Sequence, residues 1–200
     1  MTAHAGDDFT LFPESLGKLA PMVMRSRAGA STRLANRLFA ASLADRCSPG
    51  DTLELDKRPF DLRAAVPLPP LMRVYLYTMT THPSERQQGA YRIQIILPNK
   101  GRHFDTTDDA YVILAGYNPN LEVFALWDAD AHDIGKGIPH SKGVQILEDT
   151  LFEAMSLGVA RQTRKLRGTD ESETVVASRP DTLPEALELR WQLSIERLIS

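Results

Sequence analysis

Aspartate and histidine residues cluster just after residue 127 and are the side chains in this sequence best suited to metal-dependent chemistry. Asp128, Asp130 and His132 stand close together, and Ser141 follows farther along the chain. Carboxylate and imidazole groups can bind a divalent metal, and a metal-bound water can then cleave a phosphodiester. Aspartate-rich segments after strands also form ordinary turns, in which the carboxylates cap backbone N–H groups. We therefore predict no metal or other cofactor, and keep Asp128, Asp130 and His132 as minor metal candidates.

The sequence lacks the common motifs of a self-sufficient enzyme. None of its lysines has an acidic residue two positions earlier, the spacing that directs a carboxylate and an ammonium group to one metal-bound water. It contains no phosphate-binding loop, no Gly-x-Ser-x-Gly elbow and no dinucleotide-binding glycine motif. These absences favour a binding module over an enzyme. The enzymatic alternative is an atypical metal-dependent endonuclease that requires Mg²⁺ and uses Asp109 together with the three metal candidates.

Two stretches concentrate positive charge, although the formal net charge of the chain is -3. Every charged residue between positions 15 and 44 is basic, and residues 154–169 are also free of acids. Segregated cations in an acidic chain are typical of a surface that follows nucleic-acid phosphates, although two solvated faces would give the same pattern. The residues predicted to contact phosphate are Arg33, Arg37, Arg161, Arg164 and Lys165.

A third group of polar residues occupies residues 78–94, where we predict the ends and tip of a β-hairpin. Arginine and glutamine can each form paired hydrogen bonds with base edges, and a threonine methyl can contact thymine. Strand alternation places Arg92 and Gln94 on the face opposite Tyr91. A structural ion pair of Arg92 with Asp128 or Asp109 is an equally good interpretation. The candidate DNA contacts here are Thr80, Arg86, Tyr91, Arg92 and Gln94, with His132 and Ser141 beside them.

The elements that position these residues are strands joined by turns, with helices near both ends. Alternation predicts one hairpin from residues 72–80 and 90–97, and a second from 110–117 and 121–127 around Asn118-Pro119-Asn120. Short strands are expected at 144–146 and 173–178. Helices are expected at 11–24, from about 31 to the turn at 48–50, at 147–157 and from about 181 onward. The last helix would direct Leu187, Trp191, Ile195 and Leu198 into the core.

This order predicts an α+β fold with a central antiparallel or mixed sheet built from hairpins. The proline-rich residues 66–70 divide a helical N-terminal subdomain, 1–70, from a sheet-rich recognition domain, 71–200, unless the two form one compact domain. A single cysteine, Cys47, and the lack of a signal peptide or long apolar run predict a cytoplasmic protein that does not enter a membrane. A homodimer is compatible with the sequence.

Several motifs occur in an order that resembles a known class of domain. They are the aromatic strand and Tyr-Arg-Ile-Gln run within 75–94, Gly116-Tyr117, the strand and aspartate at 123–128, and Thr-Val-Val-Ala at 174–177. Over about residues 75–199 the chain resembles a DNA-recognition domain associated with bacterial restriction endonucleases. The resemblance implies a module of a restriction or defence system that reads double-stranded DNA, modified bases included, for a separate nuclease domain or subunit. It implies first contacts from Arg86, Arg92 and Gln94. A protein-interaction domain without nucleic-acid binding is the remaining alternative.

Overall fold

The computed structural model describes residues 29–48, 54–81, 89–98, 102–138, 140–166 and 170–199. The helices are α2 (Gly29–Ala41), α3 (Ala129–His132), α4 (Glu148–Leu157) and α5 (Leu183–Ile199), with 3-10 turns η2 (Thr107–Asp109) and η3 (Pro180–Thr182). The strands are β1 (Cys47–Ser48), β2 (Phe60–Ala64), β3 (Leu71–Thr78), β4 (Ala90–Ile95), β5 (Tyr111–Asn118), β6 (Val123–Trp127), β7 (Lys142–Leu147), β8 (Val159–Lys165) and β9 (Ser172–Ser178).

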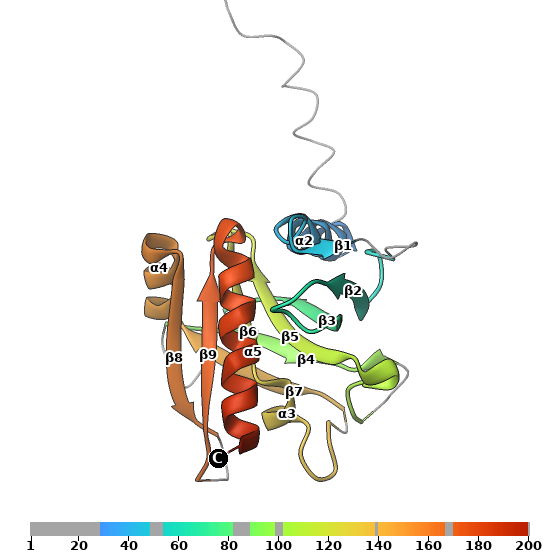
Figure 1. Cartoon of the computed structure of the whole chain (residues 1–200). Coiled ribbons are helices and arrows are strands. Elements are labelled where there is room, and N and C mark those ends of the chain that lie inside the picture. Colours follow the sequence, from blue (N-terminus) through green and yellow to red (C-terminus); the bar gives the residue numbers. More distant parts are fainter. Residues whose placement is uncertain are drawn as a thin grey trace, which may run out of the picture.

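Most strands form one mixed sheet in the order β1-β2-β3-β5-β6-β9-β8. Its β3–β5 pair is parallel, and its other pairs are antiparallel. The strands β1 and β2 come from the first seventy residues and join the same sheet as β3. Strands β4 and β7 form a separate antiparallel pair, which we call the ribbon. The predicted α+β class, with a mixed sheet and helices toward both ends, is confirmed (Figure 1).

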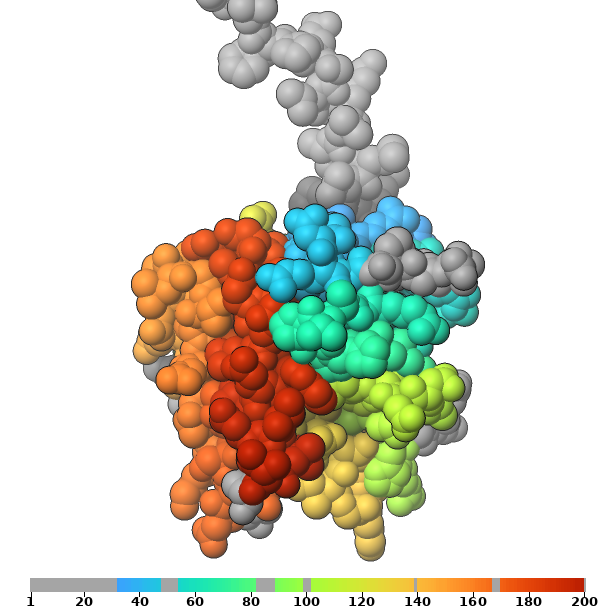
Figure 2. All heavy atoms as spheres, viewed as in Figure 1, coloured from blue at the N-terminus to red at the C-terminus, as the bar shows by residue number. Residues whose placement is uncertain are grey.

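Both faces of the large sheet are covered, so the molecule has three layers. On one face, α2 and α5 contribute Phe39, Leu183 and Leu187 to a core with the sheet, and α5 runs across this face in Figures 1 and 2. On the other face, the ribbon contributes Ile93 and Ile146, and α4 contributes further apolar side chains. Burial of both faces explains why central strands such as β6 are apolar at every position rather than at alternate ones.

The first predicted hairpin is wrong, whereas the second is confirmed. Strand β3 lies between β2 and β5, and β4 pairs with β7, so that one isolated bridge between Thr80 and Arg92 connects the two stretches. β3 is buried on both faces at its six central positions and needs strand neighbours on both sides. In the β5–β6 hairpin, Asn118 Oδ1 accepts hydrogen bonds from the N–H groups of Asn120 and Leu121, which fixes the turn locally.

The structure corrects three further expectations. The acid-free residues 159–165 form strand β8, which had not been predicted as a strand. Helix α2 ends at Ala41 rather than at the turn near residue 48, and the predicted helix 11–24 lies outside the described residues. In α5, Ile195 and Leu198 are exposed, while Arg190 and Ser194 are buried instead. No helix in the described part of the chain is long and apolar enough to cross a membrane.

Candidate nucleic-acid interface

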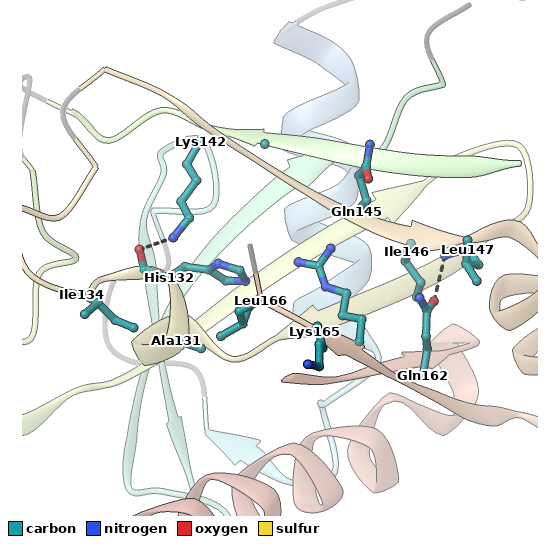
Figure 3. Close-up of a pocket in the computed structure, with 12 residues that line it drawn as sticks. Ala131, His132, Ile134, Lys142, Gln145, Ile146, Leu147, Gln162, Lys165 and Leu166 are labelled. Carbon is teal, nitrogen blue, oxygen red and sulfur yellow. Dashed lines mark hydrogen bonds between the residues drawn. The ribbon is translucent and has the colours of Figure 1, made fainter. Parts of the chain in front are cut away.

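A pocket of about 620 Å³ lies between β7 of the ribbon and β8 at the end of the large sheet (Figure 3). None of the residues that line it is acidic. Its apolar walls include Ile134, Ile146 and Leu166. Its polar lining consists of His132, Lys142, Gln145, Gln162, Arg164 and Lys165.

Strand β7 turns one edge of its backbone toward this pocket. Among the described strands it pairs only with β4, so its other edge carries no neighbouring strand. The bridge to Thr80 occupies both backbone polar groups of Arg92, so the opposite residue, Gln145, turns its own N–H and C=O away from β4, and its C=O accepts from Trp127 Nε1 at 3.2 Å. The same alternation turns Gly143 and Leu147 outward. The Leu147 N–H confirms this direction, since it donates to Gln162 Oε1 across the gap at 2.9 Å.

Strand β8 forms the opposite wall, and its alternation places Arg161 and Arg164 on opposite faces. Gln162 and Arg164 share the face of Ala160, which belongs to the core beneath the ribbon. Arg161 alternates to the other face and is exposed there. Lys165, at the end of the strand, lines the pocket with its side chain 76% exposed. Arg161 and Arg164 therefore do not share one basic face.

Beneath the pocket, a fully buried carboxylate holds two of the lining side chains. Glu173 Oε1 accepts hydrogen bonds from His132 Nε2 and from the Asp128 backbone N–H, each at 3.0 Å. Its other oxygen accepts from Arg164 Nε at 3.0 Å. Burial alone would raise the pKa of Glu173, but the hydrogen bond and charge of His132 and the charge of Arg164 hold it below its usual value. The carboxylate is therefore ionised and fixes both side chains in place.

His132 has a second ring nitrogen that is not satisfied. Because the Glu173 carboxylate only accepts, Nε2 carries the proton that joins them. Nδ1 is buried and has no hydrogen-bond partner within the described part of the structure. The carbonyl oxygen of His132 accepts from Lys142 Nζ at 2.9 Å, which draws that lysine across the pocket (Figure 3). Burial lowers the pKa of Lys142.

Two of the three predicted metal candidates, Asp128 and Asp130, are bound by arginines. Asp128 Oδ2 lies 2.9 Å from Arg197 Nε and 3.4 Å from Arg190 Nη2, and Asp130 lies 2.9 Å from Arg197 Nη2. Asp128 also caps α3 by accepting from the Ala131 N–H. Among the described residues, no group of three or more histidine, cysteine, aspartate or glutamate side chains is arranged to bind a metal. The cluster joins α3 to the buried polar face of α5.

The outer face of the ribbon lies beside the pocket and carries other predicted contacts. Gln94 is exposed and its amide donates to Ser141 Oγ at 3.0 Å. Arg92 lies opposite Gln145 in the ladder and is half-buried. Tyr91 alternates to the inner face and packs against the core. Thr80 is exposed beside the bridge to Arg92, and Arg86 lies outside the described residues.

The predicted α2 cations lie elsewhere, because α2 packs near β3 whereas β8 is the strand at the far end of the sheet. Arg33 Nε lies 2.7 Å from Asp56 Oδ1, with both side chains more than half exposed. Arg37 lines a small hollow together with Glu54 and Asp56. The structure thus brings His132, Arg164 and Lys165 together, places Arg92, Gln94 and Ser141 beside them, and leaves Arg33 and Arg37 apart.

Sequence reasoning missed four residues of this region: Gln145, Gln162, Glu173 and Arg190. Glu173 follows Asp170 and Glu171 in the sequence, so its residue type does not distinguish it from an exposed acid of the preceding loop. Gln145 and Gln162 carry no indication either until β7 and β8 are known to face one another.

The fold and pocket define an α+β domain with a cationic pocket at the open edge of a two-stranded ribbon. Residues 70–187 match the Methylase-associated X1 family, and because this is well over half of the chain, the chain belongs to that family. The match links the chain to methylases and to restriction–modification systems. The resemblance stated from sequence is confirmed at that level. Comparison with curated proteins and with solved structures gives no match.

Proposed function

We propose that this chain is a DNA-binding specificity module of a methylase-linked restriction or defence system, and that it contacts double-stranded DNA through the pocket between β7 and β8. It would serve a separate methylase or nuclease subunit in the cytoplasm. The observation that carries the proposal is the lining of the pocket, which has three cationic side chains and no carboxylate in a chain of net charge -3. Such local segregation is the electrostatic footprint of a phosphate-binding surface.

The pocket lining and the adjoining ribbon face would make different kinds of contact with DNA. Lys165 is largely exposed, and its nearest carboxylate, Asp170, is 3.9 Å away and fully exposed, so phosphate can replace it at low cost. Arg92 and Gln94, on the adjoining ribbon face, carry the side-chain types that form paired hydrogen bonds with base edges. Phosphate contacts would set position, and the ribbon contacts would read sequence or base modification.

The proposal is tested by fluorescence anisotropy with labelled duplexes, unmodified and base-methylated, at two salt concentrations and with and without Mg²⁺. We expect binding that weakens steeply with salt, without a requirement for Mg²⁺ and without cleavage. Preference for one modified duplex would identify a reader of modified bases.

A pair of charge reversals locates the contact. Lys165→Glu should weaken binding about tenfold or more, since it replaces a phosphate contact by repulsion. Arg63→Glu, at an exposed position of β2 near the opposite end of the sheet, is the control and should change affinity less than about twofold. Absence of binding to any duplex at low salt, or equal loss in both variants, would refute the proposal.

A further inference from the structure

We infer that the pocket between β7 and β8 binds a terminal phosphate group, that is, a phosphomonoester rather than an internal phosphodiester of a DNA strand. The phosphomonoester is either the phosphorylated end of a DNA strand or a free small molecule, since both present the same group. The first source rests on the proposed function and deepens it, whereas the second does not depend on it.

The pocket is bridged at both ends by hydrogen bonds. At the start of β7, Lys142 Nζ donates to the His132 carbonyl at 2.9 Å. At the end of β7, the Leu147 N–H donates to Gln162 Oε1 at 2.9 Å, so the two bonds stand at opposite ends of the pocket (Figure 3). A phosphate within a continuous strand has a sugar on each side and would need an open path between these ends. The end of a strand needs only one way in.

The β8 wall of the pocket presents hydrogen-bond donors, while its acceptors are occupied. Gln162 Oε1 accepts from the Leu147 N–H and from Thr150 Oγ1, so its amide nitrogen remains for a ligand. Arg164 uses Nε and Nη2 on Glu173, and its Nη1 has no partner among the described residues. Neither nitrogen belongs to the enclosed polar atoms, so a ligand can reach both. A wall of donors is suited to an anion.

The charge around the pocket matches a phosphomonoester better than a phosphodiester. Three cations line the pocket, and the buried Glu173 behind the wall neutralises one of them, Arg164, so that two positive charges remain. A phosphomonoester carries a charge of about −1.5 to −2 at neutral pH, whereas a phosphodiester carries a single negative charge. Asp170 is fully exposed and 3.9 Å from Lys165, so an anion can displace it at low cost.

Lys142 is a partly buried cation without a counter-ion. Its ammonium group donates to the neutral His132 carbonyl, and within the described residues no carboxylate lies at ion-pair distance from it. Burial lowers the pKa of Lys142, and the charge of Arg164 lowers it further, so the two cations share one region of the pocket. A partly desolvated ammonium group gains more from an anion than a solvated one does.

The test replaces one donor of the pocket without changing its shape. Gln162→Glu keeps an oxygen to accept from Leu147 and puts negative charge where the amide nitrogen stood. Gln192→Glu makes the same change at an exposed position of α5, which covers the opposite face of the sheet, and is the matched control. Lys142→Gln is a second pocket variant, which removes a cation. All three variants should keep the melting temperature of the wild type.

Each protein is titrated by anisotropy with one internally labelled duplex in four forms, which carry 5′-phosphates, 3′-phosphates, hydroxyl ends, or hairpin caps in place of ends. Each protein is also titrated calorimetrically with phenyl phosphate. We expect wild type and Gln192→Glu to prefer a phosphorylated form over the capped form by at least about tenfold, or to bind phenyl phosphate. Gln162→Glu should lose that property, and Lys142→Gln should weaken it by at least about threefold.

A preference for a phosphorylated end assigns the ligand to DNA, whereas phenyl phosphate binding without an end preference assigns it to a free phosphomonoester. The inference is overturned if wild type shows neither property, or if either pocket variant retains it in full. Salt-dependent binding of all four duplexes with equal affinity in the overturned case leaves the proposed function standing. Phenyl phosphate binding without any duplex binding would remove the proposed function alone.

Discussion

Two basic regions of this protein have similar local sequences but different surroundings in the structure. The α2 region, with Arg33 and Arg37, and the β8 region, with Arg164 and Lys165, each lie in a stretch without acids. In the structure, the segment at 54–57 brings Glu54 and Asp56 against α2 and offsets its charge. The β8 cations are also paired, Arg164 with the buried Glu173 and Lys165 with the exposed Asp170 at 3.9 Å, but neither acid is among the residues that line their pocket.

The difference shows that the charge of a surface depends on which segment folds against it, and not on the local sequence alone. Arg33 and Asp56 are an exposed pair, which contributes at most about 1 kcal/mol and is screened by salt. The Glu173 carboxylate is buried, so its ion pairs position groups in the wall and are costly to break. The α2 region is an ordinary solvated face, whereas the side chains of the β8 region are held in place by a buried carboxylate.

The largest effect should come from the carboxylate beneath the pocket. Glu173→Gln leaves Arg164 without its buried counter-charge and His132 Nε2 without its carboxylate acceptor, and should lower the free energy of unfolding by about 3 kcal/mol or more. Urea denaturation at pH 7 measures this. Glu153→Gln, on the exposed side of α4, is the matched control and should change stability by less than about 0.5 kcal/mol.

The same variant gives a pH dependence with a defined sign. The folded pKa of Glu173 is lowered, so its contribution is complete above the unfolded glutamate pKa of about 4.3 and is lost as pH falls through the folded value. The stability difference between wild type and Glu173→Gln should therefore shrink as pH falls below about 4. A difference that kept growing as pH fell from about 4 to 3 would contradict an ionised Glu173.

An intermediate effect is expected where the ribbon packs on the sheet. A Cβ at Gly116 would lie 2.7 Å from both Ile93 Cγ2 and Met79 Cγ, so Gly116→Ala must push the ribbon outward. Overpacking of this kind costs about 1–3 kcal/mol. Thermal unfolding measures the cost, and Gly143→Ala, with open space around its methyl, serves as the comparison. If Gly116→Ala is as stable as wild type, the ribbon does not rest on β5 as described.

The smallest effect belongs to the α2 region. A double-mutant cycle with Arg33→Gln and Asp56→Asn should give a coupling below about 1 kcal/mol that falls further in 0.5 M salt. The measurement is urea denaturation of the four proteins. A coupling free energy of several kcal/mol would mean that the side chains of the α2 region are held as strongly as those of the pocket wall. It would contradict the proposed difference between the two regions.

Local patterns predicted the elements whose partners are near in sequence. Asn118 Oδ1 accepts from backbone N–H groups two and three residues later in the β5–β6 turn, so this turn could be predicted from the local sequence. Strand β3 could not be paired this way, because it is buried on both faces and its parallel partner β5 is remote. The basic block at 161–165 was recognised as cationic, but its strand, with charged side chains alternating across an edge, carries little apolar periodicity.

The site residues likewise divide into those that their residue type indicates and those that depend on partners distant in the sequence. His132, Arg164 and Lys165 were singled out by residue type, and the structure places them around one pocket. Glu173, which holds both His132 and Arg164, lies 41 residues from His132, and such a pairing is visible only after the strands are ordered. Asp128 was considered as a turn carboxylate or a minor metal candidate, whereas its ion-pair partners come from α5, where apolar spacing had suggested a hydrophobic face.

The measurement that most directly tests the central claim compares two charge-matched double variants in duplex binding across a salt series. Lys142→Gln with Lys165→Gln should lose at least tenfold in affinity and reduce the slope of log K against log salt by about 1.8, as expected for two lost phosphate contacts. Arg33→Gln with Arg37→Gln should stay within about twofold of wild type, with an unchanged slope. Equal losses in the two variants, or a larger loss from the α2 pair, would contradict the assignment of DNA to the pocket between β7 and β8.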